Sequence, residues 1–366
     1  MLKHISIKGF KSIKKLDLDL SPINVLIGAN GSGKSNFISF FKLLNWMMKP
    51  SGQLQFFVAR SGGADSFLFE GAAVTPQIEA ELNFESNSGK NDYSFRIFHA
   101  ASDTFIFAEE KYRFYQNTVK RWVDWNSLDA GHKESKLLDI KLYNQEAKNL
   151  YSLMQSLNVY QFHDTTETAS IKNRSNINDN YYLREDAGNL APFLLRIRET
   201  EPRYYQRIVE TIRQIAPFFG DFLFSGGDSP LLLQWAEKGS GLLFSPDQAS
   251  DGTLRVMALV TLLLQPPDTL PDVLILDEPE LGLHPYAISV IGGLINSVSN
   301  RCQVILATQS PLLVDCFEPE DIIVVERNER ESSFTRLVEA DLEDWLEEYS
   351  LSELWNKNVL GGRPSR

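Results

Sequence analysis

The stretch GANGSGKS at residues 28–35 decides how this chain folds. It fits the pattern G-x-x-x-x-G-K-[ST], in which glycines let backbone N–H groups turn inward and the following helix N-terminus adds positive charge. Such a loop cradles phosphates. Within the pattern, Lys34 is expected to reach the β- and γ-phosphates of a nucleotide, and Ser35 is expected to place its hydroxyl on Mg²⁺.

The residues on either side of this loop support the same interpretation. Residues 23–27, INVLI, are typical of a buried strand, and residues 36–48 have the apolar spacing of a helix. A glycine-rich turn without function would need neither this strand–loop–helix order nor a matching carboxylate further along the chain. The sequence therefore predicts a phosphate-binding loop at the end of a buried strand.

A second segment supplies the matching carboxylates. Residues 273–278, VLILDE, predict a buried parallel strand that ends in two acids. Asp277 is expected to hold Mg²⁺ through water, and Glu278 to position or polarise the attacking water. The alternative is an apolar strand that ends in two solvated acids. Because phosphoryl transfer needs both metal placement and a water-orienting group, the presence of the loop favours the first interpretation.

Two more segments carry polar groups suited to a nucleotide. Residues 303–309, QVILATQ, predict another buried strand, whose last side chain, Gln309, either donates toward the γ-phosphate or attacking water or simply caps the strand. Ser250 and Gly252 precede a predicted helix for which Asp251 is a plausible N-cap. That helix N-terminus is a second seat for an anion, which makes sense if it closes on the nucleotide of another subunit.

Composition limits the class of protein. The 366 residues suggest two to three domains as a prior, and 43% hydrophobic content is ordinary for a folded chain. A net charge of −12 lowers the expectation of strong non-specific DNA binding. Two cysteines in apolar settings, no signal-peptide core and no apolar stretch long enough for a bilayer favour a cytoplasmic protein that does not enter membranes.

The expected fold class is α/β, with a P-loop NTPase head that is split in sequence by an inserted α+β lobe. Phosphate-site chemistry is missing between the two halves, where aromatic strand-like runs and helical patterns occur instead. The expected parts are the first half of the head at 1–84, the inserted lobe at 85–224, the second half of the head at 225–330 and a C-terminal helical tail at 331–366.

Together these motifs resemble the ABC-type ATPase heads of the SMC, RecF and OLD group, and more closely the stand-alone AAA family ATPases of bacteria and phage-defence islands. Besides the phosphate loop, the resemblance covers most of the chain through IKGFKSI at 7–13, FHDT at 162–165, DEPELGLHP at 277–285, YSLSELW at 349–355 and LGGRP at 360–364. The loop and the aspartate–glutamate pair are the specific marks.

The resemblance implies a homodimer, or a higher oligomer built from it, with two ATP molecules sandwiched between subunits. It implies that residues 250–253 contact the γ-phosphate bound by the other chain and that Gln161 contacts Mg²⁺ and water. The candidate ATP contacts are Lys11, Asn30, Gly31, Ser32, Gly33, Lys34, Ser35, Asn36, Ser250 and Gly252. The candidate Mg²⁺ contacts are Ser35, Asp277 and Gln161, and the candidate catalytic residues are Lys34, Glu278 and Gln309.

The chain also departs from that group. Gln309 stands where such heads usually carry a histidine, so a charge-based sensing role does not transfer to it. The signature differs from the Leu-Ser-Gly-Gly-Gln of transporters, which argues against a transport subunit. Long heptad arms are missing, and no segment after about residue 330 is suited to hold the acidic cluster of a Toprim nuclease.

The expected function is an ATP-binding and Mg²⁺-dependent ATP-hydrolysing switch that controls a separately encoded effector, such as a nuclease, in antiviral defence. The alternative is a DNA-binding ATPase of repair or maintenance, and a third class is a nucleotide-bound scaffold in which Glu278 is idle. The DNA alternative would use a basic face, unless its arginines pair with Glu199, Glu201 and Glu210. Those arginines are Arg196, Arg198, Arg203, Arg207 and Arg213.

Overall fold

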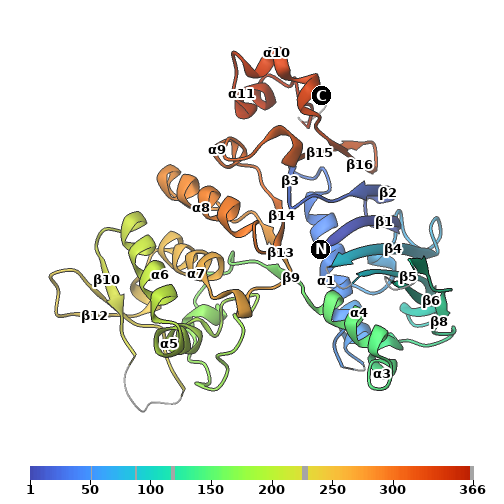
Figure 1. Cartoon of the computed structure of the whole chain (residues 1–366), viewed down its shortest axis with the longest axis horizontal. Helices are drawn as coiled ribbons and strands as arrows, with labels where there is room; N and C mark the ends of the chain where they lie inside the picture. Colours follow the sequence, from blue (N-terminus) through green and yellow to red (C-terminus); the bar gives the residue numbers. More distant parts are fainter. Residues whose placement is uncertain (51, 87–88, 117–119, 225–229, 363–366) are drawn as a thin grey trace.

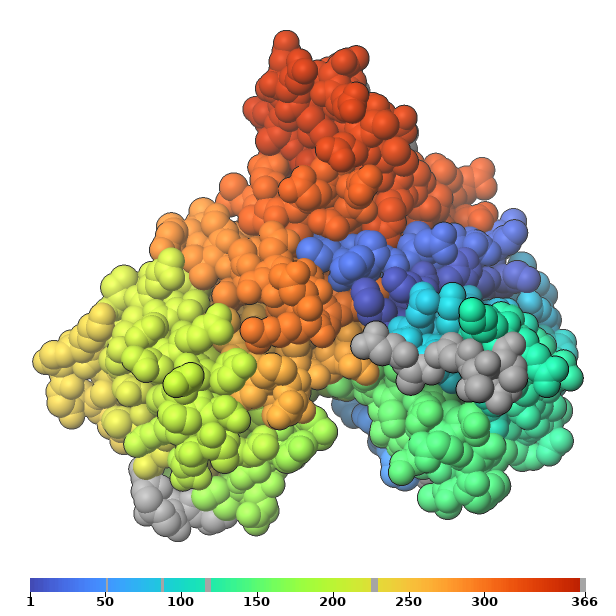
Figure 2. Space-filling view, in the orientation of Figure 1, coloured from blue at the N-terminus to red at the C-terminus, as the bar shows by residue number. Residues whose placement is uncertain are grey.

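The computed structural model describes residues 1–50, 52–86, 89–116, 120–224 and 230–362. A central sheet joins an antiparallel sheet on one side, a helical lobe on the other and a short helical segment at the C-terminal end (Figure 1). The space-filling view has a three-lobed outline with a notch between the two lower lobes (Figure 2). Among the described residues, no helix is long and apolar enough to cross a membrane.

The central sheet places the ends of its strands at one edge. Its six strands run in the order β16-β15-β3-β14-β13-β9, all parallel to their neighbours except β16, which is antiparallel to β15. Their bounds are β3 Ile23–Ile27, β9 Leu157–Tyr160, β13 Val273–Asp277, β14 Gln303–Ala307, β15 Ile322–Asn328 and β16 Glu331–Arg336. The expected buried strands at 23–27, 273–277 and 303–307 are therefore neighbours.

Alternate residues of this sheet pack into two different cores, because both of its faces are covered. Leu26 and Ile305 pack on the side of α1 (Lys34–Met47), whereas Val25 and Val304 pack with α7 (Asp251–Leu264) and α8 (Pro285–Val298). Such double coverage explains why the strands are continuous apolar runs without alternation. The helix expected at 36–48 begins two residues earlier because the end of the phosphate loop already forms its first turn.

The antiparallel sheet is larger than the sequence suggested. Its order is β2-β1-β4-β5-β6-β7, with β8 also paired to β6. The bounds are β1 Leu2–Phe10, β2 Ile13–Asp19, β4 Gln77–Ser86, β5 Gly89–Ala100, β6 Thr104–Gln116, β7 Arg121–Trp122 and β8 Asn126–Ser127. The expected boundary between residues 84 and 85 thus falls inside β4, and the aromatic runs after it extend the first half of the head.

The expected lobe at 85–224 is therefore divided between three places. Its first strands belong to the antiparallel sheet, and β9 is an edge strand of the central sheet, paired parallel to β13. The residues from α5 onward form the helical lobe, together with β11 and β12, which follow residue 224. In this lobe α6 packs on α7 and α8. This lobe contains α5 Leu190–Thr200, α6 Pro202–Ile215, β10 Phe219–Phe222, β11 Trp235–Glu237 and β12 Leu243–Phe244.

The remaining elements are short. The helices are α2 Gln53–Arg60, α3 Leu137–Ile140, α4 Gln145–Gln155, α9 Pro311–Val314, α10 Glu343–Leu346 and α11 Leu351–Asn356. Single 3-10 turns occupy Asp65–Phe67, Ser170–Lys172, Pro246–Gln248, Pro267–Thr269, Pro319–Asp321 and Glu339–Asp341. In Figure 1, α10 and α11 lie beside α9 and β15, at the carboxyl end of the chain.

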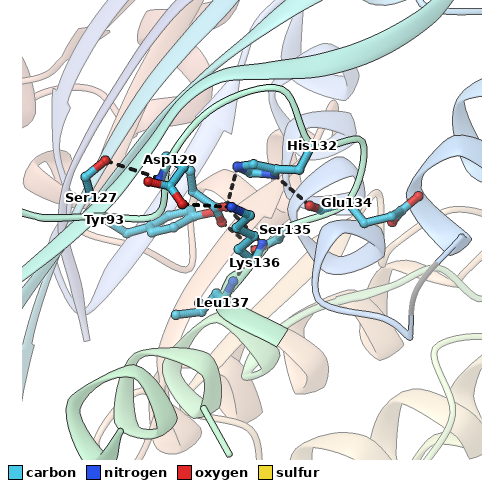
Figure 3. A network of polar contacts seen from close by, with 9 residues as sticks. Tyr93, Ser127, Asp129, His132, Glu134, Ser135, Lys136 and Leu137 are labelled. Atoms are coloured by element: carbon cyan, nitrogen blue, oxygen red, sulfur yellow. Dashed lines mark hydrogen bonds and ion pairs between the residues drawn. The ribbon is translucent and has the colours of Figure 1, made fainter. Parts of the chain in front are cut away.

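The antiparallel sheet encloses a polar network around the buried side chain of Glu110. Its carboxylate accepts hydrogen bonds from Tyr93 Oη at 2.7 Å, Ser135 Oγ at 2.5 Å and Lys136 N at 3.0 Å. His132 Nε2 lies 3.5 Å from the same carboxylate, and Figure 3 shows these partners gathered together. Burial raises the pKa of Glu110, while the hydrogen bonds act in the opposite direction.

Candidate nucleotide site

The phosphate loop has a backbone that requires glycine. Gly28, Gly31 and Gly33 have φ angles of 151°, 78° and 120°. A Cβ on Gly28 would collide with the carbonyl oxygen of Val325, and one on Gly33 with Ser332 Oγ. The loop is therefore packed closely on β15 and β16 at Gly28 and Gly33, whereas at Gly31 the backbone conformation alone disfavours a larger residue.

Lys34 lies inside the curve of the loop. Its Nζ donates to the carbonyl oxygens of Gly28 at 2.6 Å and Ala29 at 3.0 Å, and the residue is buried. Burial lowers the pKa of Lys34, while Glu278 and the neighbouring carboxylates act in the opposite direction. A cation held on carbonyl oxygens at the first turn of a helix is suited to receive an anion.

The loop opens onto two adjoining cavities. The first has a volume of about 210 Å³ and is lined by residues 30–36 with Glu278, Gln309 and Arg327. The second, of about 500 Å³, shares Asn36 and Arg327 with the first and is also lined by Lys11. The two together provide a phosphate-sized cavity beside a larger one, as a nucleotide requires.

Sequence reasoning missed Arg327, which lies at the junction of these cavities. Its Nη1 is 3.3 Å from the carbonyl oxygen of Gly31 in the phosphate loop. Arg327 lies near the end of β15, where no motif marks it. Its position follows only from the parallel pairing of β15 with β3, which brings residues far apart in sequence to one edge.

Asp277 ends β13 with one satisfied and one unsatisfied oxygen. Its Oδ2 accepts a hydrogen bond from Gln161 Nε2, and Gln161 in turn accepts one from Lys42. Its Oδ1 is buried without a hydrogen-bond partner, and burial raises the pKa of this carboxyl. The structure therefore places Gln161 beside Asp277, while the expected contact of Gln161 with Mg²⁺ and water stays a prediction.

The oxygens at this edge fit Mg²⁺. The unpartnered Asp277 Oδ1 is a hard ligand, and Ser35 lines the phosphate cavity together with Glu278, the residue that follows Asp277. Mg²⁺ prefers oxygen ligands and usually takes one or two from the protein, with the rest from phosphates and water. A buried carboxylate oxygen without a partner is costly unless something compensates it, so the residues present suit this ion.

Glu278 follows Asp277 in a strained conformation. Its φ is 43°, which is unusual for a residue with a side chain. Its N–H donates to the carbonyl oxygen of Ala307 at 2.8 Å, and its carboxylate accepts a hydrogen bond from Gln309 Nε2. The turn thus points the carboxylate across to the end of β14, and strain of this kind is concentrated at functional sites.

Glu280 fixes the backbone at the end of β14 and was given no role from the sequence. Its Oε1 accepts from Thr308 Oγ1 at 2.5 Å and from Gln309 N at 3.1 Å, while its Oε2 is buried without a hydrogen-bond partner. Burial raises the pKa of Glu280. Gln309 is therefore held by Glu280 through its backbone and by Glu278 through its side chain.

The segment at 250–253 lies apart from the phosphate loop of the same chain. Neither Ser250 nor Gly252 is among the described residues that line the two cavities. Ser250, and not Asp251, is the N-cap of α7, since its side chain accepts from the backbone of Thr253. Asp251 was misassigned because it is already the first helical residue.

Arg255, in the same helix as this segment, is hydrogen-bonded to the residues that follow β9 and β13. Its guanidinium donates to the carbonyl oxygens of Phe162 at 3.1 Å, His163 at 2.9 Å and Leu281 at 2.8 Å. The FHDT segment at 162–165 and the DEPELGLHP segment at 277–285 therefore both supply backbone acceptors for one side chain.

The arginines of α5 and α6 do not pair as expected. Arg196 donates to the carbonyl oxygen of Tyr181 at 3.1 Å, and Arg213 donates to that of Gly220 at 2.7 Å. Among the ion pairs of the described residues, none joins the arginines of these helices to Glu199, Glu201 or Glu210. Arg203 and Arg207 are exposed on α6.

The strand order, the phosphate loop and the carboxylates at the same sheet edge define a P-loop ATPase of the ABC-type head class. Residues 23–315 match the family described as "AAA domain, putative AbiEii toxin, Type IV TA system", and the chain belongs to this family. It is also 24% identical to the OLD nuclease of Thermus scotoductus (strain ATCC 700910 / SA-01) over 387 residues, covering 99% of this chain and 68% of that protein.

Solved structures agree on the fold. The Smc head bound to the C-terminal winged-helix domain of ScpA superposes with a TM-score of 0.63 at 18% identity, over 94% of this chain and 99% of that one. The Smc head with an extended coiled coil from Pyrococcus furiosus gives a TM-score of 0.58 at 16% identity, over 95% and 98%. The predicted fold class and the predicted relation to the SMC, RecF and OLD group are confirmed.

Proposed function

We propose that this chain binds Mg²⁺ and ATP in the two adjoining cavities and hydrolyses the ATP. The observation that carries the proposal is the pairing of Glu278 with Gln309 at the rim of the phosphate cavity, next to a buried Asp277 oxygen without a partner. Transfer of a phosphoryl group to water requires a group that positions the water and an oxygen ligand for the metal ion. At this sheet edge Glu278 and Gln309 supply the first and Asp277 the second.

Each residue then has a defined task. Lys34 transfers its hydrogen bonds from the loop carbonyls to phosphate oxygens and neutralises their charge. Glu278 accepts a proton from the attacking water, and Gln309 keeps the carboxylate turned toward it. When bound by Ser35 and Asp277, Mg²⁺ supplies positive charge to the phosphate oxygens. Gln161 orients Asp277 for that contact.

The proposed active form is a homodimer. The N-terminus of α7, with Ser250 as its cap, lies outside the cavities of its own chain. It is therefore proposed to contact the γ-phosphate held by a second copy, so that two ATP molecules lie between two chains. ATP must favour the closed dimer by about 5 kcal/mol to convert a mostly open population to a mostly closed one.

The proposed biological role is control of a separately encoded effector in antiviral defence, in the cytoplasm. The family description names a toxin of a type IV toxin–antitoxin system, and one relative is a nuclease. Those names support an ATP-driven switch that acts together with a toxic or nucleolytic activity. Co-purification of the chain with the products of neighbouring genes, with and without ATP, tests this part of the proposal.

The substitution Glu278→Gln tests the hydrolytic role. We expect phosphate release to fall by about 100-fold or more, because the amide cannot accept the proton. ATP binding should persist, and light scattering should show a trapped dimer. Glu199→Gln, which alters an exposed glutamate on α5, is the control and should behave like the parent. A Glu278→Gln protein that still hydrolyses ATP, or that shows no ATP-dependent dimer, contradicts the proposal.

A second candidate function is DNA binding by α6. It is favoured by the exposed Arg203 and Arg207, which lie one helical turn apart. DNA affinity that falls steeply with salt and disappears in the Arg203→Glu, Arg207→Glu double variant would support it. The absence of measurable binding at low salt would rule it out.

A further inference from the structure

We propose that the C-terminal tail segment Leu360–Gly362 holds the phosphate loop in its binding conformation from the outside. The inference rests on the proposed function, because it concerns ATP affinity at the same site. The sequence singled out LGGRP at 360–364 without a mechanism. Of that motif, Arg363 and Pro364 lie outside the described residues, so the argument uses residues 360–362 alone.

The tail is hydrogen-bonded directly to the loop. The carbonyl oxygen of Gly362 accepts from Ala29 N at 2.7 Å, and Gly362 N donates to Glu326 Oε1 at 2.9 Å. Glu326 lies on β15, which pairs in parallel with β3, the strand that leads into the loop. The tail therefore bridges the loop and the strand beside it.

Glycine is required at the point of contact. Gly361 and Gly362 have φ angles of 81° and 77°, which side chains disfavour. A Cβ on Gly362 would lie 3.1 Å from Val324 Cγ1, 3.3 Å from Gly28 Cα and 3.4 Å from Trp355 Nε1. Because one of these atoms belongs to the phosphate loop itself, a larger side chain must displace either the tail or the loop.

The helix α11, which precedes the tail segment, is anchored near Gln309, the partner of Glu278. In α11, Ser352 donates through its N–H to Asp315 Oδ1 at 2.8 Å and through Oγ to Asp315 Oδ2 at 2.6 Å. Asp315 is the C-cap of α9, and α9 begins at Pro311, just after Gln309. The buried side chains of Leu354, Trp355 and Leu360 add apolar contacts. The tail thus connects the segment after β14 to the phosphate loop.

This arrangement has a consequence for binding. Ala29 is held by the tail through its N–H and by Lys34 through its carbonyl oxygen, so the two peptide groups on either side of its Cα are each hydrogen-bonded. A loop that is already ordered loses less freedom when ATP binds, and affinity rises accordingly. Gly361 and Gly362 are therefore positioning residues, since they act on ATP only through the loop.

The test is Gly362→Val, with Gly239→Val as its matched control. Gly239 has a similar φ of 73°, but a Cβ added there would meet nothing within 4 Å. We expect Gly362→Val to weaken ATP binding about tenfold in titrations with a fluorescent ATP analogue, and to raise KM about as much with kcat within about threefold. Gly239→Val should match the parent, and circular dichroism should show both variants folded.

A second pair of variants keeps the test decisive if Gly362→Val does not fold. Glu326→Ala removes the acceptor of Gly362 N, whereas Glu326→Gln keeps an oxygen there. We expect about threefold weaker ATP binding in the first and parental binding in the second. Unchanged affinity in Gly362→Val, or equal affinities in the two Glu326 variants, overturns the inference alone. A parent protein that does not bind ATP overturns the proposed function and this inference together.

Discussion

Glu110 in the antiparallel sheet and Asp277 at the edge of the central sheet are both buried carboxylates, and burial raises the pKa of each. They differ in how their oxygens are satisfied. Glu110 accepts three hydrogen bonds, whereas Asp277 keeps one oxygen buried without a partner. The difference separates two uses of a buried charge, since a satisfied group stabilises the fold and an unsatisfied one is available to a ligand.

The largest expected effect comes from Asp277→Asn. We expect ATP hydrolysis to fall by about 1,000-fold, because an amide is a poor ligand for Mg²⁺. The melting temperature without nucleotide should stay the same or rise, since the change removes a buried charge that is not fully compensated. Phosphate release and thermal denaturation measure the two quantities. If Asp277→Asn kept full activity or lost much stability, the proposed difference between Asp277 and Glu110 would be wrong.

For Glu110→Ala we expect a loss of stability without a loss of ATP binding, the reverse of Asp277→Asn. Two buried hydroxyl donors and one partly buried N–H lose their acceptor, so the free energy of unfolding should fall by about 3 kcal/mol, measured by urea denaturation. ATP affinity should remain within about twofold of the parent, because Glu110 makes no contact with the nucleotide cavities. Glu109→Ala, on the same strand but partly exposed, is the control and should cost less than about 1 kcal/mol.

A smaller effect is expected for Gln309→Ala, which removes the hydrogen bond to Glu278. Hydrolysis should fall about tenfold while ATP affinity is unchanged, because the amide orients a catalytic group and leaves the phosphate loop intact. Steady-state turnover and equilibrium titration separate the two. If ATP binding weakens as much as turnover, Gln309 contacts the ground-state nucleotide instead.

The smallest effect is a dependence of stability on pH. Because burial raises the pKa of Asp277 and Glu280 in the folded chain, the protonated forms favour folding. Their contribution is fully present below the unfolded value of about 4 and is lost as pH rises through the folded pKa. From about pH 4 upward, the melting temperature should therefore fall less with rising pH in Asp277→Asn than in the parent. Identical slopes would mean that Asp277 does not titrate in this range.

Local patterns predicted the strands and the helix that carry the candidate nucleotide site. A few consecutive residues are enough to recognise each of three elements: the phosphate loop, the strand that leads to Asp277 and Glu278, and the strand that ends before Gln309. Parallel strands with short polar ends then bring these groups to one edge without further information. The structure places Gln161 against Asp277 at the same edge, and the Mg²⁺ contact that the family resemblance implied for Gln161 stays a prediction.

What the sequence did not predict depends on contacts between distant segments. The strand Leu157–Tyr160 has only four residues, which is too short a pattern to predict its pairing with β13. The partner of Ala29 is Gly362, from the far end of the chain, and Glu280 is defined by its bonds to Thr308 and Gln309. Local sequence patterns do not reveal contacts between residues so far apart in the chain. The composition change near residue 85 falls inside the strand β4.

Arg255 has a consequence for how far the chain can diverge in sequence. Its three acceptors are all main-chain carbonyl oxygens, at Phe162, His163 and Leu281. Substitution of a side chain at one of those three positions leaves the main-chain oxygen in place, so the hydrogen bond from Arg255 can still form. Replacement of Arg255 by lysine is different, because a single ammonium cannot reproduce a planar group that donates in three directions. Homologues that keep these three main-chain contacts should therefore retain arginine at 255.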